Sequence, residues 1–136
     1  MKLAHKAHVA LIDGENFTLL RNDGQIFEPK LTKEDAPQLD VTNYSAGVRH
    51  QDNIGRELGR TDLEELGHAA AATEWLNAKA ISGDLSDEVL IIADPKSLGE
   101  MRNHYHTELK NRLVGEIDKT LTGQPLDKLA QAIAAE

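Results

Sequence analysis

The sequence predicts a single α/β domain, built on a mixed five-stranded sheet that is flanked by helices. Three observations lead to this class. Two Asp-Gly pairs separate short β-prone runs near the N-terminus, one apolar run has the composition of a buried strand, and later segments show helical spacing. The length of 136 residues and a hydrophobic fraction of 40% fit one globular domain over residues 1–136. The expected order of elements is β-β-β-α-β-α-β-α.

The first three strands are predicted from the Asp-Gly pairs. Three β-prone runs cover residues 8–12, 17–20 and 25–27, with the pairs at 13–14 and 23–24 between them. Because Asp and Gly tolerate the positive φ of tight turns, this pattern predicts an antiparallel meander. We expect Asp13 and Asp23 to act as turn formers.

Residues 34–60 have no sustained hydrophobic period, and we expect a long flexible loop there. A structureless loop of more than about 12–15 residues in a compact domain is commonly functional or disordered. Its second half is locally basic in an otherwise acidic chain, so it is either a solvated loop or a contact for an anion or RNA. The candidate binding residues are Arg49, His50, Arg56 and Arg60.

A long helix and a buried strand follow this loop. Residues 61–64 (TDLE) fit a capping box, which predicts a helix from Thr61 that ends near Gly83. The apolar, β-branched run at 88–93 (EVLIIA) is typical of a strand buried on both faces. Asp94-Pro95 then supplies an N-cap and a proline in the first helical position.

Weaker patterns complete the chain. An apolar stripe extends the helix that starts at Pro95, with a break near His106-Thr107, and a short strand is expected at 114–117. Pro125 opens a final helix over 126–135. Three antiparallel strands followed by alternating helix and strand match the topology of ribonuclease-H-like folds.

Charge and composition exclude several classes of protein. With 15 basic and 23 acidic residues, the net charge of −8 opposes general binding to phosphate backbones, and five aromatic residues argue against a base-stacking platform. The absence of cysteine excludes disulfides, thiolate metal sites and cysteine nucleophiles. No apolar run approaches the roughly 20 residues of a membrane span, and no secretory signal is visible, so we expect a cytoplasmic protein.

Carboxylates are the first candidates for chemistry. Asp13 ends the first strand and Asp94 ends the fourth, and these strand ends can be neighbours in a sheet of this topology. Glu64 or Glu65 on the long helix could complete a magnesium site of the nuclease type. A metal-dependent nuclease is therefore one alternative for the function.

Histidines and known motifs give no further site. His104 and His106 would point to opposite faces of a helix, and we expect His68 to be surface-exposed or half-buried. No zinc-protease, nucleophile-elbow or phosphate-loop motif occurs. We therefore assign no catalytic residue, no metal and no cofactor.

Several segments resemble a bacterial family, the "protein required for attachment to host cells". Residues 8–22 (HVALIDGENFTLLRN) resemble its opening, and residues 51–56 (QDNIGR) resemble its Asp-Arg-Pro-Gly-Arg loop, from which Asn53-Ile54 depart. Residues 89–133 match best, with a strand, Pro95, LGEMR, EIDKTLT and a closing helix in the family's order. The resemblance covers almost the whole chain.

This resemblance implies a role in the attachment of bacteria to host cells and no defined reaction. Combined with the missing signal and membrane segments, it favours a non-enzymatic intracellular protein. The expected partner is a protein of unknown identity, without a small-molecule cofactor or a membrane contact.

The same family is distantly similar to the catalytic domain of archaeal and eukaryotic release factors. In that domain a Gly-Gly-Gln tip follows the early strands, precedes a long helix and acts on the peptidyl-tRNA ester. The corresponding residues 44–60 contain Gly47 and Gln51 but no Gly-Gly-Gln. The resemblance thus implies an alternative function, that of an RNA- or ribosome-associated factor that contacts tRNA or the ribosome through the basic residues of this segment.

Overall fold

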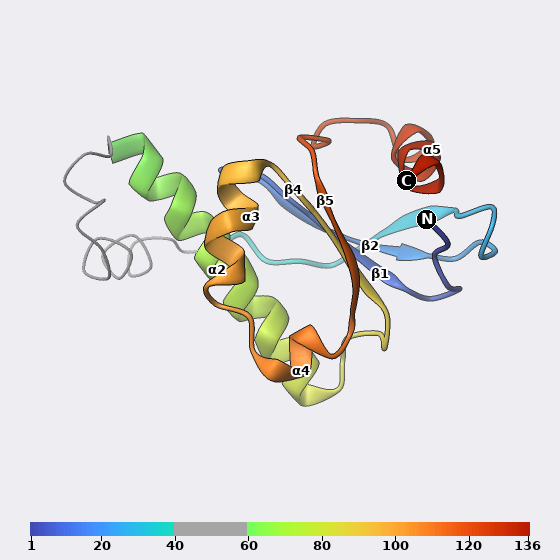
Figure 1. Cartoon of the computed structure of the whole chain (residues 1–136), viewed down its shortest axis with the longest axis horizontal. Helices are drawn as coiled ribbons and strands as arrows, with labels where there is room; N and C mark the ends of the chain where they lie inside the picture. The colour runs from blue at the N-terminus through green and yellow to red at the C-terminus, as the bar shows by residue number, and fades with distance from the viewer. Residues whose placement is uncertain (40–59) are drawn as a thin grey trace.

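Five strands form one mixed sheet in the computed structural model, which describes residues 1–39 and 60–136. The strands are β1 (His8–Ile12), β2 (Phe17–Asn22), β3 (Leu31–Glu34), β4 (Val89–Ala93) and β5 (Leu113–Asp118). Their order is β3-β2-β1-β4-β5, with antiparallel pairing from β1 through β3 and parallel pairing among β1, β4 and β5 (Figure 1). The predicted α/β class, the five-stranded mixed sheet and the antiparallel meander are confirmed.

Helices cover both faces of this sheet. In the described residues they are α2 (Arg60–Ser82), α3 (Pro95–Arg102), α4 (Thr107–Lys110) and α5 (Leu126–Ala135). The first three pack on one face and α5 packs on the other, beside the N-terminal segment (Figure 1). None of the helices that the structure describes is long and apolar enough to cross a membrane.

The central strands are buried because alternate side chains enter two separate cores. On β1, Ala10 and Ile12 pack toward α2 and α3, whereas Val9 and Leu11 pack toward α5. The strand β4 divides its side chains in the same way and is fully buried. The parallel pair of β1 and β4 is therefore the scaffold from which the residues after its strand ends are positioned.

Helix ends follow local sequence signals closely. Asp94 is the N-cap of α3, since its carboxylate accepts a hydrogen bond from the backbone amide of Ser97 at 3.1 Å. Gly83 ends α2 with a φ of 81°, a conformation that favours glycine. The start of α2 differs from the prediction, because the helix begins at Arg60 and Thr61 lies inside it rather than at the cap. Arginine is a good helix former and extends the helix by this residue.

The predicted third strand at residues 25–27 is wrong. These residues form a turn in which the amide of Gln25 donates to the carbonyl of Glu28 at 3.1 Å, and β3 begins only at Leu31. The buried side chain of Asn22 accepts hydrogen bonds from the amides of Gly24 and Lys30, both at 2.9 Å. These hydrogen bonds stabilise a connection between β2 and β3 that is longer than the Asp-Gly pair alone predicts.

The helix after β4 is interrupted near the predicted break. α3 ends at Arg102 and α4 begins at Thr107. The side chain of Asn77 on α2 spans the gap, donating to the carbonyl of His104 at 2.8 Å and accepting from the amide of His106 at 3.0 Å. A contact from another helix thus satisfies the backbone groups that the break exposes.

Candidate functional site

The carboxyl ends of β1 and β4 meet at one edge of the sheet. In their parallel register Ile12 lies opposite Ala93, so Asp13 and Asp94 follow neighbouring strands. This adjacency was predicted from the sequence. The two carboxylates nevertheless bind different partners.

Asp13 closes the turn between β1 and β2. Its Oδ1 accepts the amides of Glu15 and Asn16 at 2.7 and 2.6 Å, and its Oδ2 accepts the hydroxyl of Thr122 at 2.5 Å. Partial burial raises the pKa of this carboxyl, but the hydrogen bonds outweigh burial and hold the pKa below its ordinary 3.8. Asp13 is therefore an anionic turn former, as the sequence predicts.

Two of the other predicted metal ligands also have partners, although Oδ1 of Asp94 is buried without a hydrogen bond among the described residues. Asp94 caps α3, and the carboxylate of Glu65 on α2 pairs with the ammonium of Lys96 at 2.9 Å. Within residues 1–39 and 60–136, no group of three or more His, Cys, Asp or Glu side chains is placed to hold a metal ion. The nuclease alternative gains no support from these residues.

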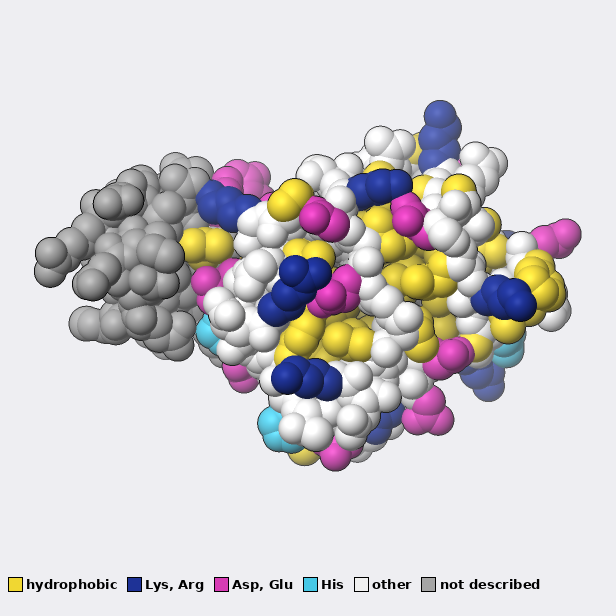
Figure 2. Space-filling model, in the orientation of Figure 1, with side chains coloured by type: hydrophobic (Ala, Val, Ile, Leu, Met, Phe, Trp, Pro, Cys, Tyr) yellow, Lys and Arg dark blue, Asp and Glu magenta, His cyan; other side chains and the backbone are white. Residues whose placement is uncertain are grey.

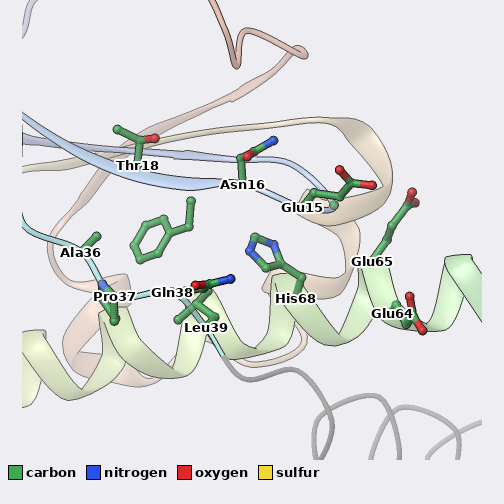
Figure 3. Close-up of a pocket in the computed structure, with 12 residues that line it drawn as sticks. Glu15, Asn16, Thr18, Ala36, Pro37, Gln38, Leu39, Glu64, Glu65 and His68 are labelled. Carbon is green, nitrogen blue, oxygen red and sulfur yellow. The ribbon is translucent and has the colours of Figure 1, made fainter.

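A cavity of about 570 Å³ opens beside the Asp13 turn. Its walls come from the β1–β2 turn, the segment after β3 and the first half of α2 (Figure 3). The lining residues are Gly14, Glu15, Asn16, Phe17, Thr18, Ala36, Pro37, Gln38, Leu39, Glu64, Glu65 and His68. The cavity thus lies where the chain enters and leaves residues 40–59, the stretch that contains most of the predicted binding residues.

His68 is the most buried polar residue of this lining, with 7% of its surface exposed. Its Nδ1 lies 2.8 Å from the carbonyl oxygen of Asp13 and must donate, because a carbonyl only accepts. In the neutral ring, Nε2 is then an acceptor, and it has no hydrogen-bond partner among the described residues. His68 is thus more buried than the surface or half-buried position predicted from the sequence. A bond between residues 55 positions apart leaves no local sequence signal.

Three of the four predicted basic residues lie outside the described part of the chain. Arg49, His50 and Arg56 lie outside the described residues, as does most of the predicted loop at 34–60. Arg60 is the first residue of α2, and its side chain is not among those described. Their role in binding therefore stays a prediction.

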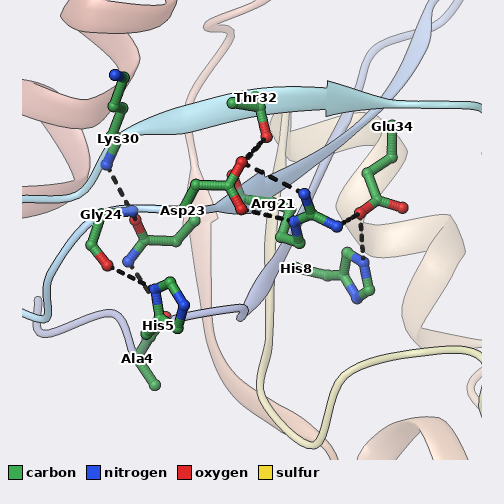
Figure 4. Close-up of polar contacts among 10 residues, drawn as sticks. Ala4, His5, His8, Arg21, Asp23, Gly24, Lys30, Thr32 and Glu34 are labelled. Atoms are coloured by element: carbon green, nitrogen blue, oxygen red, sulfur yellow. Dashed lines mark hydrogen bonds and ion pairs between the residues drawn. The ribbon is translucent and has the colours of Figure 1, made fainter.

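A second cavity of about 660 Å³ lies at the opposite end of β1. There His8 Nδ1 accepts the amide of Ser86 at 2.9 Å, so the proton is on Nε2, which faces the Glu34 carboxylate at 3.6 Å (Figure 4). Burial lowers the pKa of His8 below 6.5 despite the opposing effect of Glu34. The lone pair of Nδ1 is thus used for structure, whereas Nε2 is buried without a hydrogen-bond partner among the described residues. The neutral ring of His8 therefore has no free lone pair for base catalysis.

The fold and the site define a small α/β protein whose long helix follows a segment with candidate nucleic-acid contacts. The chain belongs to the bacterial archaeo-eukaryotic release factor family 12, whose family model matches residues 6–133. No curated protein matches the chain. The family assignment agrees with the predicted relation to release factors, whereas the predicted membership of the host-attachment family and the function it implies receive no support.

Proposed function

We propose that this protein is an RNA-associated factor that contacts tRNA or the ribosome. The family match over residues 6–133 carries the proposal, because it relates nearly the whole chain to release factors. The position of the basic residues supports it, since they fall between the end of β3 and the first residue of the long helix α2, where the related domain has its functional tip. A role on the ribosome implies a location in the cytoplasm.

The contact is assigned to Arg49, His50, Arg56 and Arg60. Arginine donates two parallel hydrogen bonds to a phosphate, which suits an acidic protein that must bind RNA through a small local surface. The sequence has no Gly-Gly-Gln, so the proposal concerns binding and includes no hydrolytic step. The cavity beside Asp13 is lined by Leu39, the last described residue before this segment, and by Glu64 near the start of α2.

Co-sedimentation with ribosomes at increasing salt tests the proposal. The wild-type protein should sediment at low salt and dissociate as salt releases its phosphate contacts. The variant Arg49→Ala/Arg56→Ala should bind more weakly, and its salt dependence should fall by about one unit of slope for each lost contact. The matched control Lys110→Ala/Lys128→Ala removes the same charge from two exposed lysines on α4 and α5.

Two results would contradict the proposal. Unchanged sedimentation of the arginine variant would remove the assigned contact. Equal loss in the arginine variant and the lysine control would show that overall charge, rather than this segment, governs the association.

A further inference from the structure

The cavity beside Asp13 contains a buried hydrogen-bond acceptor that the fold does not use. His68 is 7% exposed, and because its Nδ1 donates to the carbonyl of Asp13 at 2.8 Å, the lone pair of the neutral ring is on Nε2. No donor among the described residues binds this nitrogen. Figure 3 shows the ring projecting from α2 toward the β1–β2 turn, within the lining of the cavity. A ligand that enters the cavity can therefore complete the hydrogen bonding of His68 if it brings an N–H or O–H donor.

Other polar groups of the lining are acceptors as well. The amide nitrogen of Asn16 donates to both carboxylate oxygens of Asp13, at 3.2 and 3.1 Å, and no described residue donates to its carbonyl oxygen. Carboxylates, which only accept when they are ionised, add further oxygen atoms at Glu15, Glu64 and Glu65. The lining therefore favours a ligand that is rich in donors.

The charge of the lining is negative, because no lysine or arginine is among its described residues. Lys96, outside the lining, pairs with Glu65 at 2.9 Å, whereas the exposed Glu15 forms no ion pair with the described residues. The side chain of Glu65 packs against Gly14, next to Glu15, so two carboxylates lie at one end of the cavity (Figure 3). Over the molecular face in Figure 2, by contrast, acidic and basic side chains are interspersed. The cavity therefore attracts a cation and repels a phosphate.

The cavity also has an apolar wall. It is formed by Phe17, Ala36, Pro37 and Leu39, and all but Pro37 pack against the hydrophobic core. Trp75 contacts the ring of Phe17 edge-to-face, with 5.3 Å between the ring centroids. The volume of about 570 Å³ is within the roughly 300–1,000 Å³ of small-molecule sites. A carbon stem can pack on this wall while a charged head contacts the acceptors.

We propose that this cavity binds an organic cation, an ammonium or guanidinium group on an apolar stem, with an N–H of the cation donating to Nε2 of His68. Hydrogen bonds from such a group to carboxylates are charge-assisted and therefore stronger than those of a neutral ligand. The carboxylate of Glu15 binds the head, and the side chains of Phe17 and Leu39 contact the stem. This ligand chemistry occurs in free polyamines and in the basic side chains of peptides. The inference goes beyond the proposed RNA contact, because its ligand has the opposite charge to a phosphate.

Titration of the whole protein with n-butylguanidinium, followed by nitrogen–proton NMR, tests the site. The wild-type protein should bind this cation about tenfold more tightly than n-butylurea, which has the same shape and N–H donors but no charge. The resonances of Glu15 and His68 should shift on binding. Butyrate, an anion with a similar stem, should not bind. Equal affinity for n-butylurea would show that the cavity selects only an apolar stem, and this result would overturn the proposal.

Two variants test the assigned acceptors. His68→Asn retains a donor for the carbonyl of Asp13 and removes Nε2, so it should bind n-butylguanidinium about tenfold more weakly. Glu15→Gln should weaken binding by about threefold, since an exposed charge contributes little, and its exposed position keeps the test valid if His68→Asn does not fold. Glu108→Gln removes the same charge from an exposed position on α4 outside the lining, and this matched control should bind as the wild type does. Wild-type affinity in a folded His68→Asn variant, or equal affinities of the two glutamine variants, would contradict the assignment.

Two further ligands distinguish the sources of the cation. Tighter binding of spermidine than of a blocked, glycine-flanked arginine peptide would identify a free polyamine, and the reverse order would identify a basic side chain of a protein partner. Failure of the wild-type protein to bind any of these cations would refute the proposal. No RNA is present in these titrations, so their outcome is independent of the ribosome experiment.

Discussion

The two turns that flank β2 share the dipeptide Asp-Gly and have different architectures. The first covers residues 13–16 and is organised by its own aspartate, because Asp13 accepts both turn amides. The second covers residues 23–30, and there the carboxylate of Asp23 accepts hydrogen bonds from the side chains of Arg21 and Thr32. In the second turn Asn22, one residue earlier, takes over the role that Asp13 has in the first.

The glycines of the two turns also differ in the atoms that surround them. A side chain at Gly14 would meet the flexible side chain of Glu65, whereas one at Gly24 would clash with the backbone oxygen of Glu28. The first turn can therefore adjust, and the second is locked by its own backbone. The comparison shows that a turn dipeptide specifies a reversal of the chain, while a buried neighbour sets its length and rigidity.

Deleting the organising amide should affect the second turn most. Asn22→Ala removes four hydrogen bonds from a fully buried site and leaves carbonyls and amides without partners. We expect a loss of about 3 kcal/mol in the free energy of unfolding, measured by urea denaturation. Asn16→Ala, the same substitution at the exposed position of the first turn, should lower it by only about 0.5 kcal/mol. Equal losses would show that Asn22 is not the organiser.

The only two phenylalanines provide a second comparison, since one belongs to each turn. Phe17 follows the first turn and packs edge-to-face on Trp75, with ring centroids 5.3 Å apart, whereas Phe27 points to solvent. Phe17→Ala should lower the free energy of unfolding by about 2 kcal/mol, because the ring is only half-buried. Phe27→Ala should change it by less than about 0.5 kcal/mol. A large loss at Phe27 would mean that its exposed ring also stabilises the fold.

Local patterns predicted most of the fold. The bounds of β1 and α5 were predicted to the residue, and β4 differs by one residue, because strand composition and a helix-opening proline act within a few positions. The third strand was missed because the buried role of Asn22 depends on Leu3 and Ala4, which precede it by many positions.

The candidate site was less predictable for a related reason. Asp13 was recognised as a turn former because its partners are its own neighbours in sequence. The burial of His68 was underestimated because its carbonyl partner is not close to it in sequence. Phe27, whose ring is exposed, was assigned to a strand. Periodicity identifies which residues face a core, but it carries little information about which polar groups meet across elements.

The two turns should also differ in how acid changes their contribution to stability, and this effect should be smaller than those above. The pKa of Asp13 is below 3.8 in the folded protein, so the unfolded chain binds a proton first as the pH falls. The stability from ionised Asp13 is complete above pH 3.8 and is lost as the pH falls through the lower, folded-state pKa. Asp13→Asn should therefore be about 1 kcal/mol less stable than the wild type at neutral pH, and this difference should disappear in acid.

The corresponding variant of the second turn makes the prediction specific. The hydrogen bond of Arg21, the hydroxyl of Thr32 and the charge of Arg21 lower the pKa of Asp23, and this carboxylate is partly exposed to solvent ions. The pH-dependent stability that Asp23→Asn removes should therefore decrease at high salt. The pH-dependent stability that Asp13→Asn removes should persist, because salt does not screen hydrogen bonds from backbone amides. Urea denaturation of both variants across pH, at low and high salt, measures this. If salt reduced the Asp13 effect as strongly as the Asp23 effect, long-range charge rather than the turn amides would stabilise Asp13.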